Sequence, residues 1–132
     1  MPKQIIASPK IATSALPLSQ ATRAGNLLFI GGAVGLNARG ELVGKGDIRA
    51  QTRQALENIK AIVEAAGGAL KDVTQTTVYL TDLAHYAPMN EVYASYFPIE
   101  PPARATVRVD LANRDFLIEI TAVAILEAPA AV

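Results

Sequence analysis

Apolar residues along the 132-residue chain recur at two different spacings, and the change of spacing separates strands from helices. Short runs rich in Val, Ile, Thr and aromatic residues are typical of strands. Apolar residues at three- and four-residue steps indicate one face of a helix. The order of these runs predicts the element sequence β-β-β-α-β-α-β-β.

The first part of the chain has the pattern of strands and turns. We expect a short strand at Lys3–Ser8, followed by strands at Gln20–Ala24 and Leu27–Gly32. Gly25-Asn26, between the last two, supplies the positive φ of a two-residue hairpin turn. A second turn is expected at Asn37–Gly40.

Two helices are expected in the middle of the chain. Asp47 can cap the first, and Gly67-Gly68 ends it. Asp82 is expected to cap the second, which continues to about Tyr96 before three prolines break it. The apolar stripe of the first helix comprises Ile48, Thr52, Ala55, Leu56, Ile59, Ile62, Val63 and Ala66.

The remaining strands are expected at Val73–Leu80, Ala103–Val109 and Phe116–Ile125, with a turn at Asn113–Asp115. A sheet with two helices on one face satisfies this order, which makes the fold class α+β. The opposite face of the sheet is then uncovered, so we expect sheet-to-sheet packing between subunits. The tail Glu127–Val132 is expected to be loose.

Composition narrows the class of protein. The length fits a single domain, residues 1–132. Twelve basic and twelve acidic residues balance, which counts against nucleic-acid binding. The hydrophobic content of 51% favours an oligomer with a buried apolar face. No apolar run reaches the ~20 residues that a bilayer requires and no signal peptide is visible, so we expect a soluble, cytoplasmic protein without a membrane partner.

Two kinds of catalytic site find no support in the sequence. His85 is the one histidine and cysteine is absent, so no metal site is expected. His85 is interpreted as a solvated residue of the second helix. No Gly-x-Ser-x-Gly motif marks a nucleophile. The glycine-rich segment Gly31–Gly35 has no following lysine or helix, so a strand end with close backbone approach explains it better than a phosphate loop.

Arg104 and Glu119 carry the strongest chemical signal. Arg104 begins a strand directly after Pro101-Pro102-Ala103, where a rigid backbone lets its planar fork grip a carboxylate. Glu119 lies in the middle of an apolar strand, where partial burial raises the pKa of a carboxyl group and suits it to acid–base chemistry. On composition alone, a structural Arg–Glu ion pair is favoured over a site.

Several segments together resemble the Rid family, also called endoribonuclease L-PSP or translation-inhibitor proteins. They follow the family order and spacing and span nearly the whole chain. The segments are Gln51–Ile59 with Ala65–Gly67, Thr76–Leu83, Met89–Phe97, Pro102–Arg104 and Ile118–Ile120.

This resemblance implies a fold and an activity. The fold is a mixed, chorismate mutase-like sheet with two helices on one face, assembled as a homotrimer around a central barrel with clefts between subunits. The activity is the hydrolysis of reactive 2-imino acids of the 2-iminobutanoate and 2-iminopropanoate type, or their enamine tautomers, to 2-keto acids and ammonia. The resemblance implies no metal or organic cofactor.

The resemblance also assigns roles to residues. Arg104 matches the arginine that binds the substrate carboxylate, and Glu119 matches the glutamate that positions or activates water. Gly32 would offer its backbone N–H to the carboxylate. Asn90 and Tyr86 match positions that line the cleft, although ordinary helix surface and packing explain these two equally well.

Three residues depart from the family pattern. Leu18 replaces a tyrosine that borders the pocket, Ala33 follows Gly31-Gly32 where Ser-Gly-Gln is common, and Thr106 replaces a frequent cysteine. A pocket that is more apolar on one side suggests a different imine or lower activity on the usual ones. Deamination of aminoacrylate or aminomuconate, and a non-catalytic module that binds a small carboxylate, stay open as alternatives. Neutral charge, one histidine and few aromatic residues argue against a ribonuclease.

Overall fold

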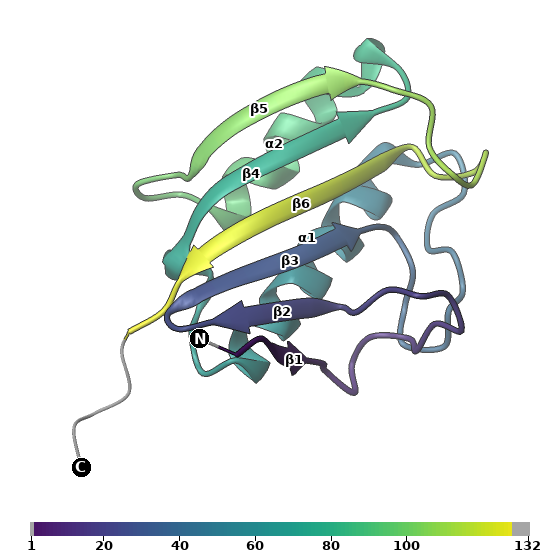
Figure 1. The fold of residues 1–132 in the computed structure, drawn as a ribbon. Coiled ribbons are helices and arrows are strands. Elements are labelled where there is room, and N and C mark those ends of the chain that lie inside the picture. Colours follow the sequence, from purple (N-terminus) through teal and green to yellow (C-terminus); the bar gives the residue numbers. More distant parts are fainter. Residues whose placement is uncertain (1, 128–132) are drawn as a thin grey trace.

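A computed structural model describes residues 2–127, which form a six-stranded β-sheet with two α-helices on one face (Figure 1). Two short 3-10 helices, η1 and η2, precede β4 and α2. The elements are β1 (Gln4–Ile6), β2 (Ala21–Ala24), β3 (Leu27–Ala33), α1 (Ile48–Ala65), η1 (Leu70–Asp72), β4 (Val73–Leu80), η2 (Leu83–His85), α2 (Tyr86–Tyr96), β5 (Ala103–Arg108) and β6 (Ile118–Ile125).

The sheet is mixed, with the strand order β1-β2-β3-β6-β4-β5. The pair β4–β5 is parallel, because α2 carries the chain back to the end of the sheet at which β4 begins. The other pairs are antiparallel. The last strand, β6, lies between β3 and β4 in the centre. The predicted α+β class and the predicted element order are both confirmed.

Alternation along β6 separates a core face from an open face. Ile118, Ile120, Ala122 and Ala124 are buried on the helix side, where α1 packs against β3 and β6. The residues between them point to the opposite face, which Figure 1 shows in front of the helices. Period-2 alternation of this kind is what a sheet covered on one side requires.

Helix α1 begins after the predicted capping residue Asp47 and ends just before the predicted Gly67-Gly68. The Asp47 carboxylate accepts a hydrogen bond from the Ala50 N–H at 3.1 Å. At the other end Gly67 adopts φ +89°, a left-handed conformation that costs glycine little. The Arg23 guanidinium, from β2, donates to the carbonyl of Ala66 at 3.1 Å and satisfies one carbonyl at the helix end.

The predicted start of the second helix is wrong by one turn. Asp82 caps η2, where its carboxylate accepts from the Ala84 N–H at 2.8 Å, and α2 begins only at Tyr86. His85 therefore lies in the 3-10 turn and is partly buried. The predicted turn at Asn37–Gly40 is present, held by the Asn37 side chain.

The strand boundaries differ from the predicted ones by two residues or fewer, and two of them change most. The first strand is shortened to Gln4–Ile6, and the last begins at Ile118 because Phe116 donates back to Asn113 in the preceding turn. Of the tail expected to be loose, residues 128–132 lie outside the described residues.

The open face of the sheet carries large apolar side chains. Cross-strand register places Ile5 and Phe29 in one row, and Phe29 is 45% exposed. An apolar sheet face that water covers is unfavourable, so this face has the character of an interface. Within residues 2–127, no helix is both long enough and apolar enough to cross a membrane. The exposed apolar residues of this face are Ile5, Leu27, Phe29, Val107 and Ile125.

Candidate functional site

Arg104 lies on β5, the edge strand of the sheet, in register with Thr76 of β4. Its side chain points to the helix side, where the guanidinium carbon lies 4.7 Å from the ring centroid of Tyr93 and 5.7 Å from that of Tyr86. The guanidinium also donates to the Tyr86 hydroxyl at 3.3 Å. Two aromatic residues of α2 thus surround the arginine.

The guanidinium of Arg104 has no carboxylate partner in the part of the chain that the structure describes. Within residues 2–127, the Lys and Arg side chains that pair with a carboxylate within 4.0 Å do not include Arg104. A cation supported by aromatic faces keeps its N–H fork available for an incoming anion. This arrangement suits the binding of a carboxylate.

Glu119 lies on β6 and points to the open face. Its cross-strand partner is Tyr79, three residues beyond Thr76. Burial raises the pKa of the Glu119 carboxyl above its ordinary value of 4.5. The sequence predicted this shift from the apolar character of the strand.

Gly32 is adjacent to Glu119 on the same face. A Cβ atom at position 32 would lie 2.5 Å from the Glu119 carboxyl carbon, which is too close for any side chain to occupy without displacing the glutamate. The glycine therefore leaves the room in which the carboxylate lies. Position 31 favours glycine for a separate reason. A Cβ there would press on the backbone carbonyls of Ser19 and Gln20, 3.3 Å away.

The structure places Arg104 and Glu119 on opposite faces of the sheet. Arg104 shares a register row with Thr76, and Glu119 shares one with Tyr79, so the two backbones lie two strands and three residues apart. These offsets correspond to about 14 Å between the two backbones. The structural ion pair favoured by composition is therefore wrong, and one copy of the chain does not bring the two residues together.

Each of the other predicted site residues lies on the side of either Arg104 or Glu119. Thr106 follows Arg104 on the same face of β5, and Asn90 lies one helical turn after Tyr86, so both belong to the arginine side. Leu18 is 60% exposed in the loop before β2. The next two residues, Ser19 and Gln20, have their carbonyls beside Gly31. Leu18 therefore lies nearer to Glu119 than to Arg104.

Sequence reasoning missed three buried polar residues, two beneath Arg104 and one that ties the loop before α1 to the segment entering β6. Tyr93 and Thr76 lie beneath Arg104 and share a hydrogen bond of 2.7 Å. Gln51 is fully buried and bonds the carbonyls of Gly44 and Asp115 and the N–H of Leu117. The seven-residue spacing from Tyr86 to Tyr93 was the available signal, because it places both rings on one face of a helix.

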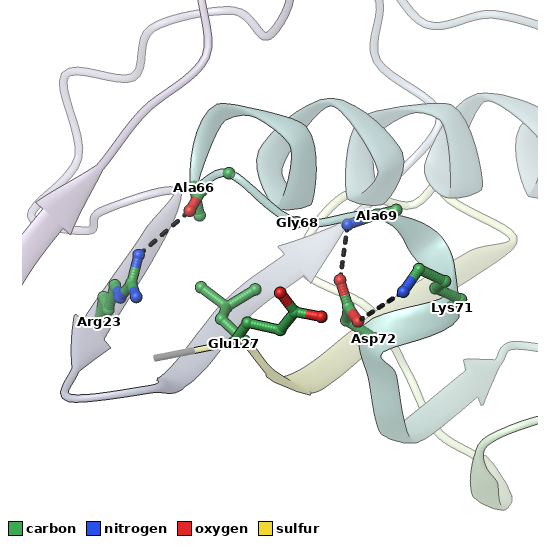
Figure 2. A pocket seen from close by; sticks show the side chains of 9 residues that line it. Arg23, Ala66, Gly68, Ala69, Lys71, Asp72 and Glu127 are labelled. Carbon is green, nitrogen blue, oxygen red and sulfur yellow. Dashed lines mark hydrogen bonds and ion pairs between the residues drawn. The ribbon is translucent and has the colours of Figure 1, made fainter. Parts of the chain in front are cut away.

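A cavity of about 460 Å³ lies at the C-terminal end of α1, away from both groups (Figure 2). Three of its charged side chains, Arg23, Lys71 and Asp72, already have partners. Arg23 donates to the carbonyls of Gly25 and Ala66, and Asp72 accepts from the Ala69 N–H at 2.8 Å and pairs with Lys71 at 3.8 Å. These contacts hold the helix end and the β2–β3 hairpin, which is a structural role. In the part of the chain described, no three His, Asp or Glu side chains gather closely enough to hold a metal ion.

Comparison with known sequences finds relatives along almost the whole chain. A sequence profile of the family described as Endoribonuclease L-PSP matches residues 9–126. A RutC family protein of Pyrococcus horikoshii is 52% identical over 126 residues, which cover 95% of this chain and 99% of that protein. The 3-aminoacrylate deaminase RutC of Acinetobacter baylyi is 46% identical over 124 residues, covering 94% of this chain and 98% of the relative.

The fold matches solved structures as well. The crystal structure of RidA from the Antarctic bacterium Psychrobacter matches with a TM-score of 0.87 at 38% identity, covering 93% of this chain and 99% of that one. The sequence profile and these relatives span almost the whole chain. The chain therefore belongs to the endoribonuclease L-PSP family, which is the Rid family that its sequence segments resemble.

Proposed function

We propose that the protein is a hydrolytic deaminase of small imino or enamine acids, which it converts to keto acids and ammonia. The observation that carries the proposal is the guanidinium of Arg104, which lies against aromatic rings at the sheet edge and has no carboxylate partner within residues 2–127. The activity of the Acinetobacter baylyi relative, a 3-aminoacrylate deaminase, supports the reaction class. Such a substrate carries the carboxylate that Arg104 would bind.

The complete site needs two copies of the chain. Arg104 and Glu119 face away from each other in one copy, and the open face that carries Glu119 is apolar. Packing the open face of one protomer against the β5 edge of another would bring the two residues to one cleft. We propose a homotrimer around a central barrel, with Arg104 of one protomer and Glu119 of its neighbour in each cleft.

In this cleft Arg104 orients the substrate. Its planar fork donates two hydrogen bonds to the carboxylate, and the Gly32 backbone N–H offers a third. Tyr86 and Asn90 would border the bound acid on the arginine side. Fixing the carboxylate places the neighbouring C=N carbon in one position, which lowers the entropic cost of the attack by a held water.

Glu119 is proposed to activate the water. It takes a proton as the water oxygen bonds to the carbon of the protonated C=N and the π electrons move to nitrogen, which gives a carbinolamine. The proton then passes from Glu119 to the nitrogen. Ammonia leaves as the C–N bond breaks, the carbinol hydroxyl gives its proton to Glu119 and the C=O bond forms. The ammonia then takes that proton and departs as ammonium. An enamine is first protonated at carbon. The raised pKa of Glu119 suits a group that both takes and returns a proton.

Substrates of the 2-iminobutanoate and 2-iminopropanoate type are the first choice, and 3-aminoacrylate is the second because of the relative at 46% identity. The two substrate classes differ in the distance between the carboxylate and the carbon that water attacks. The carbon attacked is bonded to the carboxylate in a 2-imino acid and lies one bond further away in 3-aminoacrylate. Leu18 and Thr106 are proposed to set which of these distances the pocket accepts, whereas Ala33 is buried in the hydrophobic core.

A turnover panel tests the proposal. Imines generated from threonine, serine and other amino acids, together with 3-aminoacrylate, are supplied to the protein, and keto-acid or ammonia release is measured. We expect acceleration of at least one substrate and its loss in Arg104→Ala. Arg108→Ala, an exposed arginine four residues later on the same strand, is the matched control and should keep the activity. Full activity in Arg104→Ala would refute the assigned role.

Glu119→Gln separates an enzyme from a binding module. The amide keeps the size of the side chain but does not take the proton, so turnover should fall about 100-fold or more while a product keto acid still binds. Unchanged turnover would remove Glu119 as the base. Binding of keto acids without acceleration of any imine in the wild-type protein would favour the non-catalytic carboxylate-binding module.

A further inference from the structure

The orientation of Arg104 depends on the surface beneath it. An arginine side chain has several rotatable bonds, and holding it in one conformation has an entropic cost that its surroundings must offset. Within residues 2–127 that support comes from aromatic rings rather than from a carboxylate. The nearer ring is that of Tyr93, at 4.7 Å from the guanidinium carbon.

Tyr93 is itself held on two sides. It is only 5% exposed, its ring packs against Phe97 at 4.8 Å between centroids, and its hydroxyl shares a 2.7 Å hydrogen bond with Thr76. Burial raises the pKa of the Tyr93 phenol, so the ring stays neutral and meets the guanidinium with its π face. The ring is thus a fixed platform.

Thr76 connects this platform to the strand that carries the arginine. Thr76 is fully buried and is the register partner of Arg104 across the parallel pair β4–β5. The same pair of strands therefore fixes both the backbone of Arg104 and the hydroxyl of the ring beneath it.

We propose that Tyr93 is a positioning residue for Arg104, and that its hydrogen bond to Thr76 sets the plane in which the guanidinium meets a substrate carboxylate. This inference rests on the proposed function, in which Arg104 binds that carboxylate. Tyr93 contributes through Arg104 and does not touch the reacting atoms. Its loss should weaken carboxylate binding and leave the proton chemistry at Glu119 in place.

Three variants test the platform. Tyr93→Leu removes the ring and keeps an apolar side chain, Tyr93→Phe keeps the ring without the hydroxyl, and Thr76→Val removes the other end of the hydrogen bond. Tyr96→Leu is the matched control, because this tyrosine is on the same helix but is not one of the two rings that lie against Arg104. The readouts are KM and kcat with the best imine of the panel, and the Kd for 2-oxobutanoate by calorimetry.

We expect Tyr93→Leu to raise KM and the Kd about tenfold with little change in kcat, and Tyr93→Phe and Thr76→Val to raise them about two- to fivefold. Tyr96→Leu should leave KM unchanged. A purely structural role would instead lower the active fraction, and therefore kcat, without moving KM. In the Arg104→Ala background, Tyr93→Leu should have no further effect on the Kd.

The outcomes distinguish this inference from the proposed function. If Arg104→Ala loses 2-oxobutanoate binding while Tyr93→Leu binds it as the wild type does, the positioning role is overturned and the role of Arg104 stands. If Arg104→Ala binds 2-oxobutanoate normally, the proposed function itself fails. If Tyr93→Leu does not fold, Thr76→Val and Tyr93→Phe decide the matter, and wild-type KM values in both overturn the inference.

Discussion

Arg104 and Glu119 lie on opposite faces of one sheet, two strands and three residues apart. If both act on one substrate, they come from different protomers. A variant that lacks one group can then be complemented by a variant that lacks the other. Co-expression of Arg104→Ala with Glu119→Gln, each inactive alone, should restore about a quarter of the wild-type activity, because random mixing in a ring leaves that share of clefts intact.

The complementation experiment has an internal control. Co-expressing two differently tagged copies of Arg104→Ala should give no activity, since every cleft then lacks the arginine. Doubly tagged oligomers are purified and their turnover is measured. Selecting the mixed trimers raises the expected activity from about a quarter to about a third of the wild type, because one cleft of the three in each mixed trimer is intact. Mixed oligomers of the two variants that stay inactive would show that a cleft shared in this way does not exist.

Gly32→Ala should lower turnover more than stability. The added Cβ would lie 2.5 Å from the Glu119 carboxyl carbon, near the end of a flexible side chain that can move away. We expect a loss of about 1 kcal/mol in the free energy of unfolding and a marked fall in kcat as the carboxylate leaves its place. Thermal unfolding and steady-state kinetics measure the two effects. A variant with normal kcat would separate Gly32 from the position of Glu119.

The raised pKa of Glu119 gives stability a specific pH dependence. A carboxyl whose pKa is higher in the folded than in the unfolded chain stabilises the fold below its unfolded value, and this contribution is lost as pH rises through the folded value. Glu119→Gln should therefore be more stable than the wild type at pH 7, and this advantage should disappear below pH 4.5. Urea unfolding across this range checks the sign. A difference that is constant with pH would contradict it.

Gln51 should be critical for stability although it touches no substrate. It is fully buried, and its amide bonds three backbone groups from the loop before α1 and the segment that enters β6. Gln51→Leu leaves these groups unsatisfied, and we expect a loss of about 3 kcal/mol in the free energy of unfolding. Gln54→Leu, one turn later and partly exposed, is the control and should lose about 1 kcal/mol or less. Equal losses in the two variants would contradict the role of Gln51.

The sequence by itself determined the secondary structure and the family. Its local patterns placed the hairpin turn at Gly25-Asn26 and the helix cap at Asp47, because these features depend on neighbouring residues only. The apolar setting of Glu119 also gave the direction of its pKa shift. The predicted helix start at Asp82 was wrong because a capping residue begins a 3-10 turn as readily as an α-helix. Which of the two forms depends on packing further along the chain.

Only the tertiary structure decided how the site residues are arranged. Local sequence patterns do not indicate which strands pair, so they could not place β6 between β3 and β4. They also could not give the register that turns Arg104 and Glu119 to opposite faces. A shift of one residue in that register would reverse every side chain on the strand. The contact of Tyr93 with Arg104 and the clash that keeps position 32 a glycine arise between segments far apart in the chain, where only the folded backbone brings them together.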